Sequence, residues 1–285
     1  MAIFTNQAQL SYDTATLNSN VAIGEIRSAL TIEKTVLSGP TYGLGDTIVY
    51  QITVSNAGDT AVSGLKLTDS LGSYAFQALT LYPLTYQAGS AQLFLNGVLQ
   101  GAPTVCAAQP LTVKGLSVPA NGIMQLIYRA TVNQYAPLAS GEQIQNVVSL
   151  TGCALTEALT ASATVTAESG PSLIVAKSMV PVPVMENGTL TYTFVILNTG
   201  NTAATEADLV AISDLFSPIL HDITVSLDGA YWTTPARYTY NESTGQFHTV
   251  PGQITVPAAT YTQNMTTGVR SMTPGSVTLL VSGTL

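Results

Sequence analysis

Charged residues are scarce in this sequence. Only 8% of its 285 residues are Asp, Glu, Lys or Arg, whereas an average soluble protein has about 25%. Eight basic and 16 acidic residues give a formal net charge of -8, and the basic ones are scattered along the chain. We therefore expect no phosphate-binding face and no nucleic-acid partner.

Long hydrophobic runs are also missing. No stretch approaches the roughly 18 consecutive apolar residues of a membrane-spanning helix, so no membrane insertion is expected. The first residues, MAIFTNQ, show neither the basic nor the apolar region of a signal peptide. We interpret the chain as a mature or recombinant form, or as a protein that leaves the cytoplasm without a signal peptide, for example by lysis of a mother cell.

Side chains that build catalytic centres are few. The two histidines, His221 and His248, lie far apart in the sequence and have no cysteine nearby, which is not the spacing of a metal site. The sequence has no phosphate loop, nucleophile elbow or dinucleotide fingerprint. Its only cysteines, Cys106 and Cys153, are compatible with a disulfide and with two thiols alike. We expect no enzyme, no cofactor and no metal.

Period-two alternation, by contrast, recurs along the chain. It is clearest in residues 47–54, where Ile48, Tyr50, Ile52 and Val54 lie on one side of an expected half-buried strand. Many such short segments are separated by Gly, Asn and Pro. This pattern predicts an all-β fold of immunoglobulin-like Greek-key sandwiches.

The strand pattern occurs twice. Residues 188–202 repeat the alternation of residues 46–60 with the apolar positions in register. Each copy opens with an apolar strand that ends in a lysine, Lys34 or Lys177. Later strands also match, with Met124, Leu126 and Tyr128 corresponding to Val277, Leu279 and Val281. The sequence thus predicts two tandem sandwiches, at residues 30–170 and 171–285.

The two copies end differently. The first continues through two further strands, near residues 144–151 and 162–166, and the second has no counterpart of them before its end. The N-terminal segment resembles the missing pair, because residues 4–11 resemble 144–151 and residues 19–23 take the place of 162–166. We therefore predict a donor arm of two strands, residues 1–29, and an incomplete second sandwich.

The arm is expected to act on a neighbouring molecule. It runs into Leu30 with only a few residues of slack, too few to carry it back past a domain of about 40 Å. Donor and acceptor are different surfaces, so identical subunits would join head to tail in an open fibre. The expected donors are Phe4, Asn6, Ala8, Leu10, Val21 and Ile23. The expected acceptors are Leu190, Tyr192, Phe194, Val277, Leu279 and Val281.

The two matching lysines raise a question of covalent chemistry. Lys34 could face Asn146 in its own domain, and Lys177 could face Asn6 of a donated arm, in the geometry of an isopeptide bond. The simpler interpretation is that each lysine caps a strand edge or pairs with an aspartate, Asp69 in the first copy and its match Asp214 in the second.

The run Gly-Asp-Thr-Ile-Val-Tyr-Gln-Ile-Thr-Val-Ser-Asn-Ala-Gly-Asp, preceded by an apolar strand ending in Lys and followed by Leu-Thr-Asp-Ser-Leu, resembles a known repeat. It is similar to the repeat of bacterial and archaeal surface proteins called domain of unknown function eleven. The second copy departs from it at residues 186–188. The resemblance implies immunoglobulin-like sandwiches in envelope, stalk, matrix or fibre proteins, without catalytic residues.

The arrangement predicts a structural subunit of an extracellular filament on a cell or spore surface. The alternative is a cell-surface adhesin or carbohydrate-binding module that does not polymerise. Its candidate sugar-binding patch would consist of Trp232 with Tyr231, Tyr238 and Tyr240.

Overall fold

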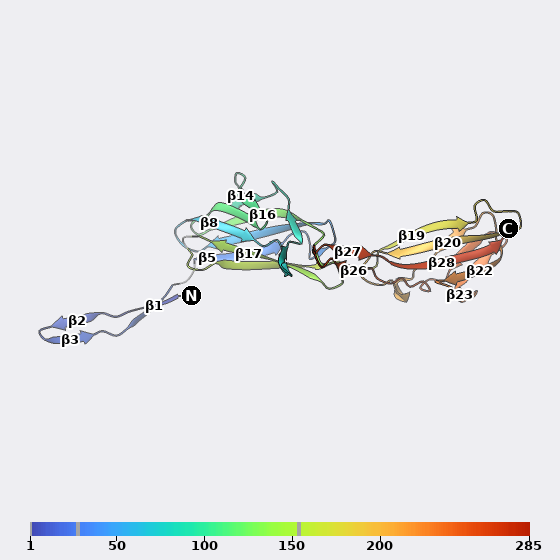
Figure 1. Cartoon of the computed structure of the whole chain (residues 1–285). Helices are drawn as coiled ribbons and strands as arrows, with labels where there is room; N and C mark the ends of the chain where they lie inside the picture. The colour runs from blue at the N-terminus through green and yellow to red at the C-terminus, as the bar shows by residue number, and fades with distance from the viewer. Residues whose placement is uncertain (1, 27–28, 153–154) are drawn as a thin grey trace. The chain divides into compact units, whose positions relative to one another are not determined.

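The computed structural model describes residues 2–26, 29–152 and 155–285 (Figure 1). The described chain is almost entirely β-structure, with one short 3-10 helix, η1 (Glu206–Asp208), so the predicted all-β class is confirmed. Two compact units divide it: the first comprises Met1–Pro40, Gly45–Asn133 and Ile144–Val165, and the second Thr41–Leu44, Gln134–Gln143 and Thr166–Leu285. The second unit therefore includes residues 41–44, 134–143 and 166–170, which the sequence assigns to the first sandwich.

The first sandwich is built on two sheets. One sheet has the strand order β13-β12-β16-β7-β5, with β11 also paired to β16. Its strands are β5 (Leu30–Val36), β7 (Thr47–Asn56), β11 (Leu84–Tyr86), β12 (Gln92–Leu95), β13 (Val98–Leu99) and β16 (Gly122–Val132). The other sheet has the order β14-β15-β8-β17-β18-β6. Its strands are β6 (Thr41–Tyr42), β8 (Val62–Asp69), β14 (Thr104–Ala108), β15 (Leu111–Val118), β17 (Gln143–Thr151) and β18 (Leu159–Ala167), and β9 (Tyr74–Phe76) and β10 (Leu79–Leu81) form a separate hairpin.

The second unit has one full sheet and one reduced sheet. The full sheet has the order β19-β20-β28-β22-β23, and the reduced sheet the order β21-β25-β24. The strands of the full sheet are β19 (Leu173–Val180), β20 (Thr189–Asn198), β22 (His221–Leu227), β23 (Ala230–Trp232) and β28 (Gly275–Thr284). The remaining strands are β21 (Ser213–Leu215), β24 (Tyr238–Asn241), β25 (Gln246–Thr249) and the hairpin β26 (Thr260–Gln263) and β27 (Arg270–Thr273).

Alternation fixes which side of each strand faces the core. Along β7 and β20 every second side chain is buried, and the two strands share one burial pattern because successive strand residues point to opposite faces. The pairing of the matching strands is also similar in the two units. Tyr50 lies opposite Tyr128 across β7 and β16, and Tyr192 lies opposite Val281 across β20 and β28.

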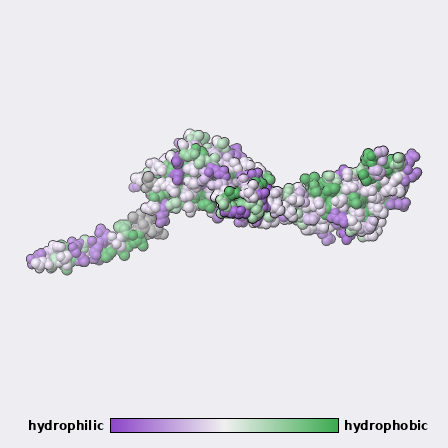
Figure 2. Space-filling view, viewed as in Figure 1, coloured by the Kyte–Doolittle hydropathy of each residue, from purple (hydrophilic) through white to green (hydrophobic). Residues whose placement is uncertain are grey.

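The N-terminal arm forms an antiparallel ribbon by itself. β1 (Ala2–Asn6) pairs with β4 (Ala22–Ile26), and β2 (Gln9–Tyr12) pairs with β3 (Ala15–Asn18). The strand predicted at residues 4–11 is thus divided into β1 and β2, whereas the one predicted at residues 19–23 overlaps β4 alone. The turn is made at Asp13, whose φ of 51° is left-handed. Apolar surface is visible on the arm and on the second unit in Figure 2.

Candidate assembly site

The inner face of the first strand differs between the two units. In β5 this face carries Leu30, Ile32, Lys34 and Val36, which are buried or half-buried. We attribute the cover to the opposite sheet, because the inward residues of β17 and β18, such as Val148 and Val165, are themselves fully buried. The first sandwich is therefore closed at this strand.

The matching face of β19 is open. Val175 lies opposite Ile196 and Met179 opposite Tyr192, both of which point into the core, so Val175 and Met179 also belong to the inner face. Leu173, Val175 and Met179 are nevertheless 38%, 54% and 50% exposed. We call this surface, together with Lys177, the open face of β19.

An open edge accompanies the open face. In the first unit β8 pairs with β15 on one side and with β17 on the other. Its counterpart in the repeat, β21, pairs with β25 alone among the strands of the described residues. Leu215, at the end of β21, is 65% exposed. The second unit thus has no described strands at the positions of β17 and β18.

A buried polar network lies at the closed face of the first unit. Lys34 Nζ is 2.6 Å from Asp69 Oδ2, and the Tyr128 hydroxyl donates to the same oxygen at 2.7 Å. Asn146 Nδ2 donates to the Tyr128 hydroxyl at 3.0 Å, while Asn146 Oδ1 accepts from the backbone N–H of Gly72. Burial lowers the pKa of Lys34 to about 8, although Asp69 opposes that shift. Burial and the Asp69 carboxylate hold the pKa of Tyr128 well above its usual value.

The second unit carries half of this network. Lys177 forms an ion pair with Asp214, and its ammonium group lies 4.3 Å from the centre of the Tyr192 ring. The side chains of Lys177 and Asp214 are 40% and 19% exposed, whereas those of Lys34 and Asp69 are 0% and 2% exposed. Val281 occupies the position of Tyr128. The ion pair is therefore present but uncovered.

The donor arm presents two distinct faces. Phe4 lies opposite Gly24 and Asn6 opposite Ala22, and opposed residues of an antiparallel pair share a face. The Phe4 ring covers Gly24 so closely that a Cβ there would overlap it. Ile23 lies opposite Thr5 and so on the other face. Of the predicted donors, all six are exposed, but Ile23 does not share the face of Phe4 and Asn6.

The predicted acceptor residues occupy a different place from the open face. Leu190, Tyr192, Phe194, Val277, Leu279 and Val281 are all buried in the core of the second unit. They form the layer beside β19 rather than the uncovered surface itself. Sequence reasoning did not single out Val175 and Met179, which the match between the opening strands of the two copies would have revealed, nor Leu215 on β21.

Other candidate sites do not assemble. Among the described residues no group of His, Cys, Asp and Glu could hold a metal ion, and none of the described helices is long and apolar enough to cross a membrane. Cys106 is exposed on β14 and Cys153 lies outside the described residues, so their disulfide stays a prediction. Trp232 and Tyr238 are buried, whereas Tyr231 is 82% exposed, and these aromatics form no open stacking patch.

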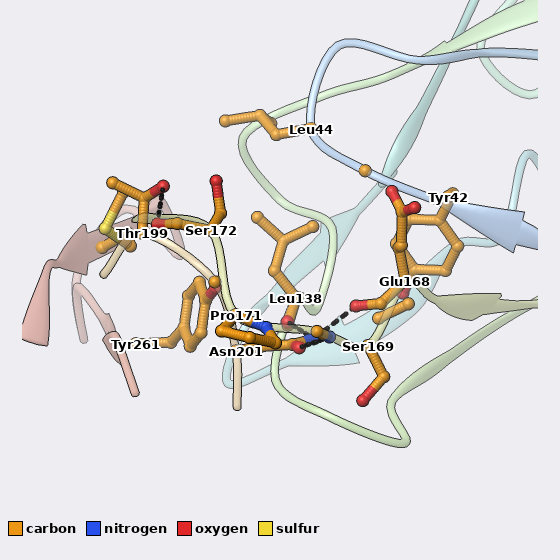
Figure 3. A pocket seen from close by; sticks show the side chains of 15 residues that line it. Tyr42, Leu44, Leu138, Glu168, Ser169, Pro171, Ser172, Thr199, Asn201 and Tyr261 are labelled. Atoms are coloured by element: carbon orange, nitrogen blue, oxygen red, sulfur yellow. Dashed lines mark hydrogen bonds between the residues drawn. The ribbon is translucent and has the colours of Figure 1, made fainter. Parts of the chain in front are cut away.

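A pocket of about 420 Å³ lies within the second unit, lined among others by Leu138, Pro171 and Tyr261 (Figure 3). The amide of Asn201 points into the group of loops and donates to the backbone carbonyls of Leu138 and Glu168. These polar groups are already paired with one another. The pocket therefore offers a loop junction rather than a set of groups directed at a ligand.

Comparisons with known proteins were made for the sequence and for the structure. Neither the family models nor the curated proteins gave a match. Among solved structures, the chain is similar to the pilus backbone RrgB of Streptococcus pneumoniae (12% identity, TM-score 0.35, 86% of this chain and 55% of that one). It is also similar to BcpA, the major pilin subunit of Bacillus cereus (13%, 0.38, 96% and 73%), and to the collagen-binding domain of a Staphylococcus aureus adhesin (9%, 0.31, 50% and 99%). This chain thus spans little more than half of the pilus backbone, and TM-scores this low support no functional argument.

Proposed function

We propose that this chain is a structural subunit of an extracellular filament, on a cell or spore surface, that polymerises head to tail by donor-strand complementation. The arm of one subunit would fill the place of β17 and β18 in the second unit of the next. One observation carries the proposal: the inner face of β19 is open, whereas the same face of β5 is closed, and the arm resembles the strands that close it.

Donor and acceptor match in chemistry as well as in position. Aligned with β17, the arm places Phe4, Asn6, Ala8 and Leu10 where Ile144, Asn146, Val148 and Leu150 lie, and all four of these β17 residues are buried. Each large apolar side chain that becomes buried contributes roughly 1.5–3 kcal/mol. New backbone hydrogen bonds along the β21 edge would add to this.

The proposal also accounts for the uncovered apolar surface of the free chain. Phe4 and Leu10 on the arm are 53% and 61% exposed, and Val175 and Met179 on β19 are exposed to a similar degree. Contiguous apolar surface of this kind marks an interaction site. One contact between arm and open face would cover both sets at once.

Size-exclusion chromatography of the full chain beside a chain that starts at Ser28 tests the proposal. We expect concentration-dependent polymers from the full chain and monomers from the shortened one. A third form, with residues 2–26 attached through a flexible linker after Leu285, should close on itself and stay monomeric. Identical monomers from the full and the shortened chain would contradict the proposal and leave the adhesin as the better hypothesis.

Mixing two defective chains decides between neighbours and self-closure. A chain without the arm keeps an acceptor, and a full chain with Val175→Asp keeps a donor. If the arm acts between molecules, the mixture should contain a heterodimer of one copy of each and nothing longer. A mixture that contains only monomers would contradict completion by a neighbour.

A further inference from the structure

The buried network of the first unit has an unusual composition. It brings together the amine of Lys34, the carboxylate of Asp69 and the carboxamide of Asn146. The side chains of Lys34 and Asp69 are 0% and 2% exposed, and Asn146 as a whole is 0% exposed. A buried lysine is costly unless it is paired. The ion pair with Asp69 meets this need, but it does not explain why a carboxamide is held in the same buried network through Tyr128.

We propose that Lys34 and Asn146 become joined by an amide bond, which ties β5 of one sheet to β17 of the other. Lys34 supplies the attacking nitrogen and the side-chain carbonyl carbon of Asn146 is the electrophile. Asp69, hydrogen-bonded to Lys34 and to Tyr128, is the proton carrier between them. The Gly72 N–H donates to Asn146 Oδ1, where negative charge develops as the carbonyl is attacked.

The reaction balances without any oxidant or cofactor. The bond from Lys34 Nζ to Asn146 Cγ forms, and the bond from Asn146 Cγ to Nδ2 breaks. Of the three protons on the ammonium group, one stays on the new amide nitrogen. The other two pass by way of Asp69 to the departing nitrogen, which leaves as ammonium, and Asp69 ends as it began.

Burial favours each step. An amine attacks only in its neutral form, and desolvation already lowers the pKa of Lys34 to about 8. The rings of Tyr50 and Tyr128 lie 4.8 and 6.0 Å from Lys34 Nζ and exclude water from the amine. Water could otherwise compete for the amide carbon. The hydrogen bonds from Lys34 to Asp69, from Tyr128 to Asp69 and from Asn146 to Tyr128 hold both partners in one buried network, which replaces a bimolecular encounter.

The test is the intact mass of the denatured, reduced full chain. We expect a mass below that of the sequence by one ammonia, and a peptide map with a branched peptide that contains both Lys34 and Asn146. Lys34→Met and Asp69→Asn should restore the full mass, whereas Lys114→Met, at an exposed lysine of β15, should not. An unshifted wild-type mass would overturn the proposal.

Two alternatives give distinct results. Succinimide formation at an Asn-Gly pair such as Asn96-Gly97 also releases ammonia. In that case the mass loss would persist in Lys34→Met and the peptide map would show no branched peptide. That result would also overturn the proposal. Asn146→Asp should lose water in place of ammonia, because the departing group changes. This isosteric variant keeps the test valid if Lys34→Met fails to fold.

The same chemistry extends to the contact between subunits, and this part rests on the proposed function. Lys177 and Asp214 form the matching pair, and Asn6 occupies the position of Asn146 in the arm. A bond from Lys177 to the neighbour's Asn6 would give ladders of multimers on a denaturing gel after boiling. Lys177→Met should abolish the ladders and leave the fibres. Wild-type fibres without ladders would refute this bond alone, whereas the absence of fibres would refute the assembly.

Discussion

Leu10→Asp tests the assembly most directly, because Leu10 is exposed in the free chain and buried in the proposed contact. The side chain is 61% exposed, and Leu10 lies opposite Leu17 in the arm ribbon. Its counterpart in the first unit, Leu150, is fully buried. The substitution should therefore leave the stability of either sandwich unchanged within about 0.5 kcal/mol.

The effect on assembly should be large. Losing the burial of one leucine costs about 1.5–3 kcal/mol, and an unpaired carboxylate in an apolar groove costs at least about 2 kcal/mol more. Together this weakens each contact by at least about 3 kcal/mol, which is more than a hundredfold in the association constant because 1.4 kcal/mol is a factor of ten. The concentration at which polymers appear should rise by the same factor.

Sedimentation of polymers over a range of concentrations measures this threshold, and thermal unfolding of the soluble fraction checks the fold. Gln9→Asp is the matched control, since Gln9 precedes Leu10 on the opposite side of the same strand and bonds only Asn18 across the ribbon. We expect Gln9→Asp to polymerise almost like the wild type. An equal threshold for Leu10→Asp and the wild type would show that the arm is not the donor.

Three further results are expected. Val175→Asp on the open face should block polymerisation, as expected for Leu10→Asp, whereas Ile174→Asp on the outer side of β19 should not. Sedimentation of the polymers compares the two variants. Asp69→Ala should destabilise the first unit by about 3–5 kcal/mol in urea unfolding, because it leaves a buried amine and a buried hydroxyl without their partner. An effect as small as that of Asp59→Ala would contradict this. Burial lowers the pKa of Lys34 from 10.5 to about 8 in the folded chain. In Asn146→Ala, where the amine stays free, the unfolded chain therefore binds more protons above pH 8, and the unfolding free energy should rise by about 1.5 kcal/mol from pH 8 to 9.5. Lys34→Met should remove this slope.

The repeat was readable from the sequence because its strands are buried on one face. A strand with one buried face must alternate, and the pattern of β7 therefore recurs in β20 with the same inner residues. The match of Lys34 with Lys177 and of Asp69 with Asp214 also predicted both ion pairs. The resemblance to the surface-protein repeat stays a prediction, as do the proposed donor and acceptor roles.

The open surface was harder to predict for the same physical reason. Alternation marks buried faces, so it directed attention to β20 and β28, whereas β19 opens with four consecutive apolar residues, 173–176, which signal no particular side. The arm presented a related difficulty. Its pairing changes register between Asn6 and Gln9, and such an irregularity shifts which residues share a face without leaving a mark in the sequence.

The identity of the two surfaces determines what kind of assembly follows. In the proposed assembly the donor is the arm before β5 and the acceptor is the open face of β19 with the edge of β21, so no residue serves in both. A closed dimer of two-fold symmetry would require two such contacts to form at once between the same pair of chains. A single contact leaves one arm and one open face free at the ends, and each addition regenerates both. Growth therefore continues until subunits are exhausted, and a chain that lacks its arm should end a filament at one end only.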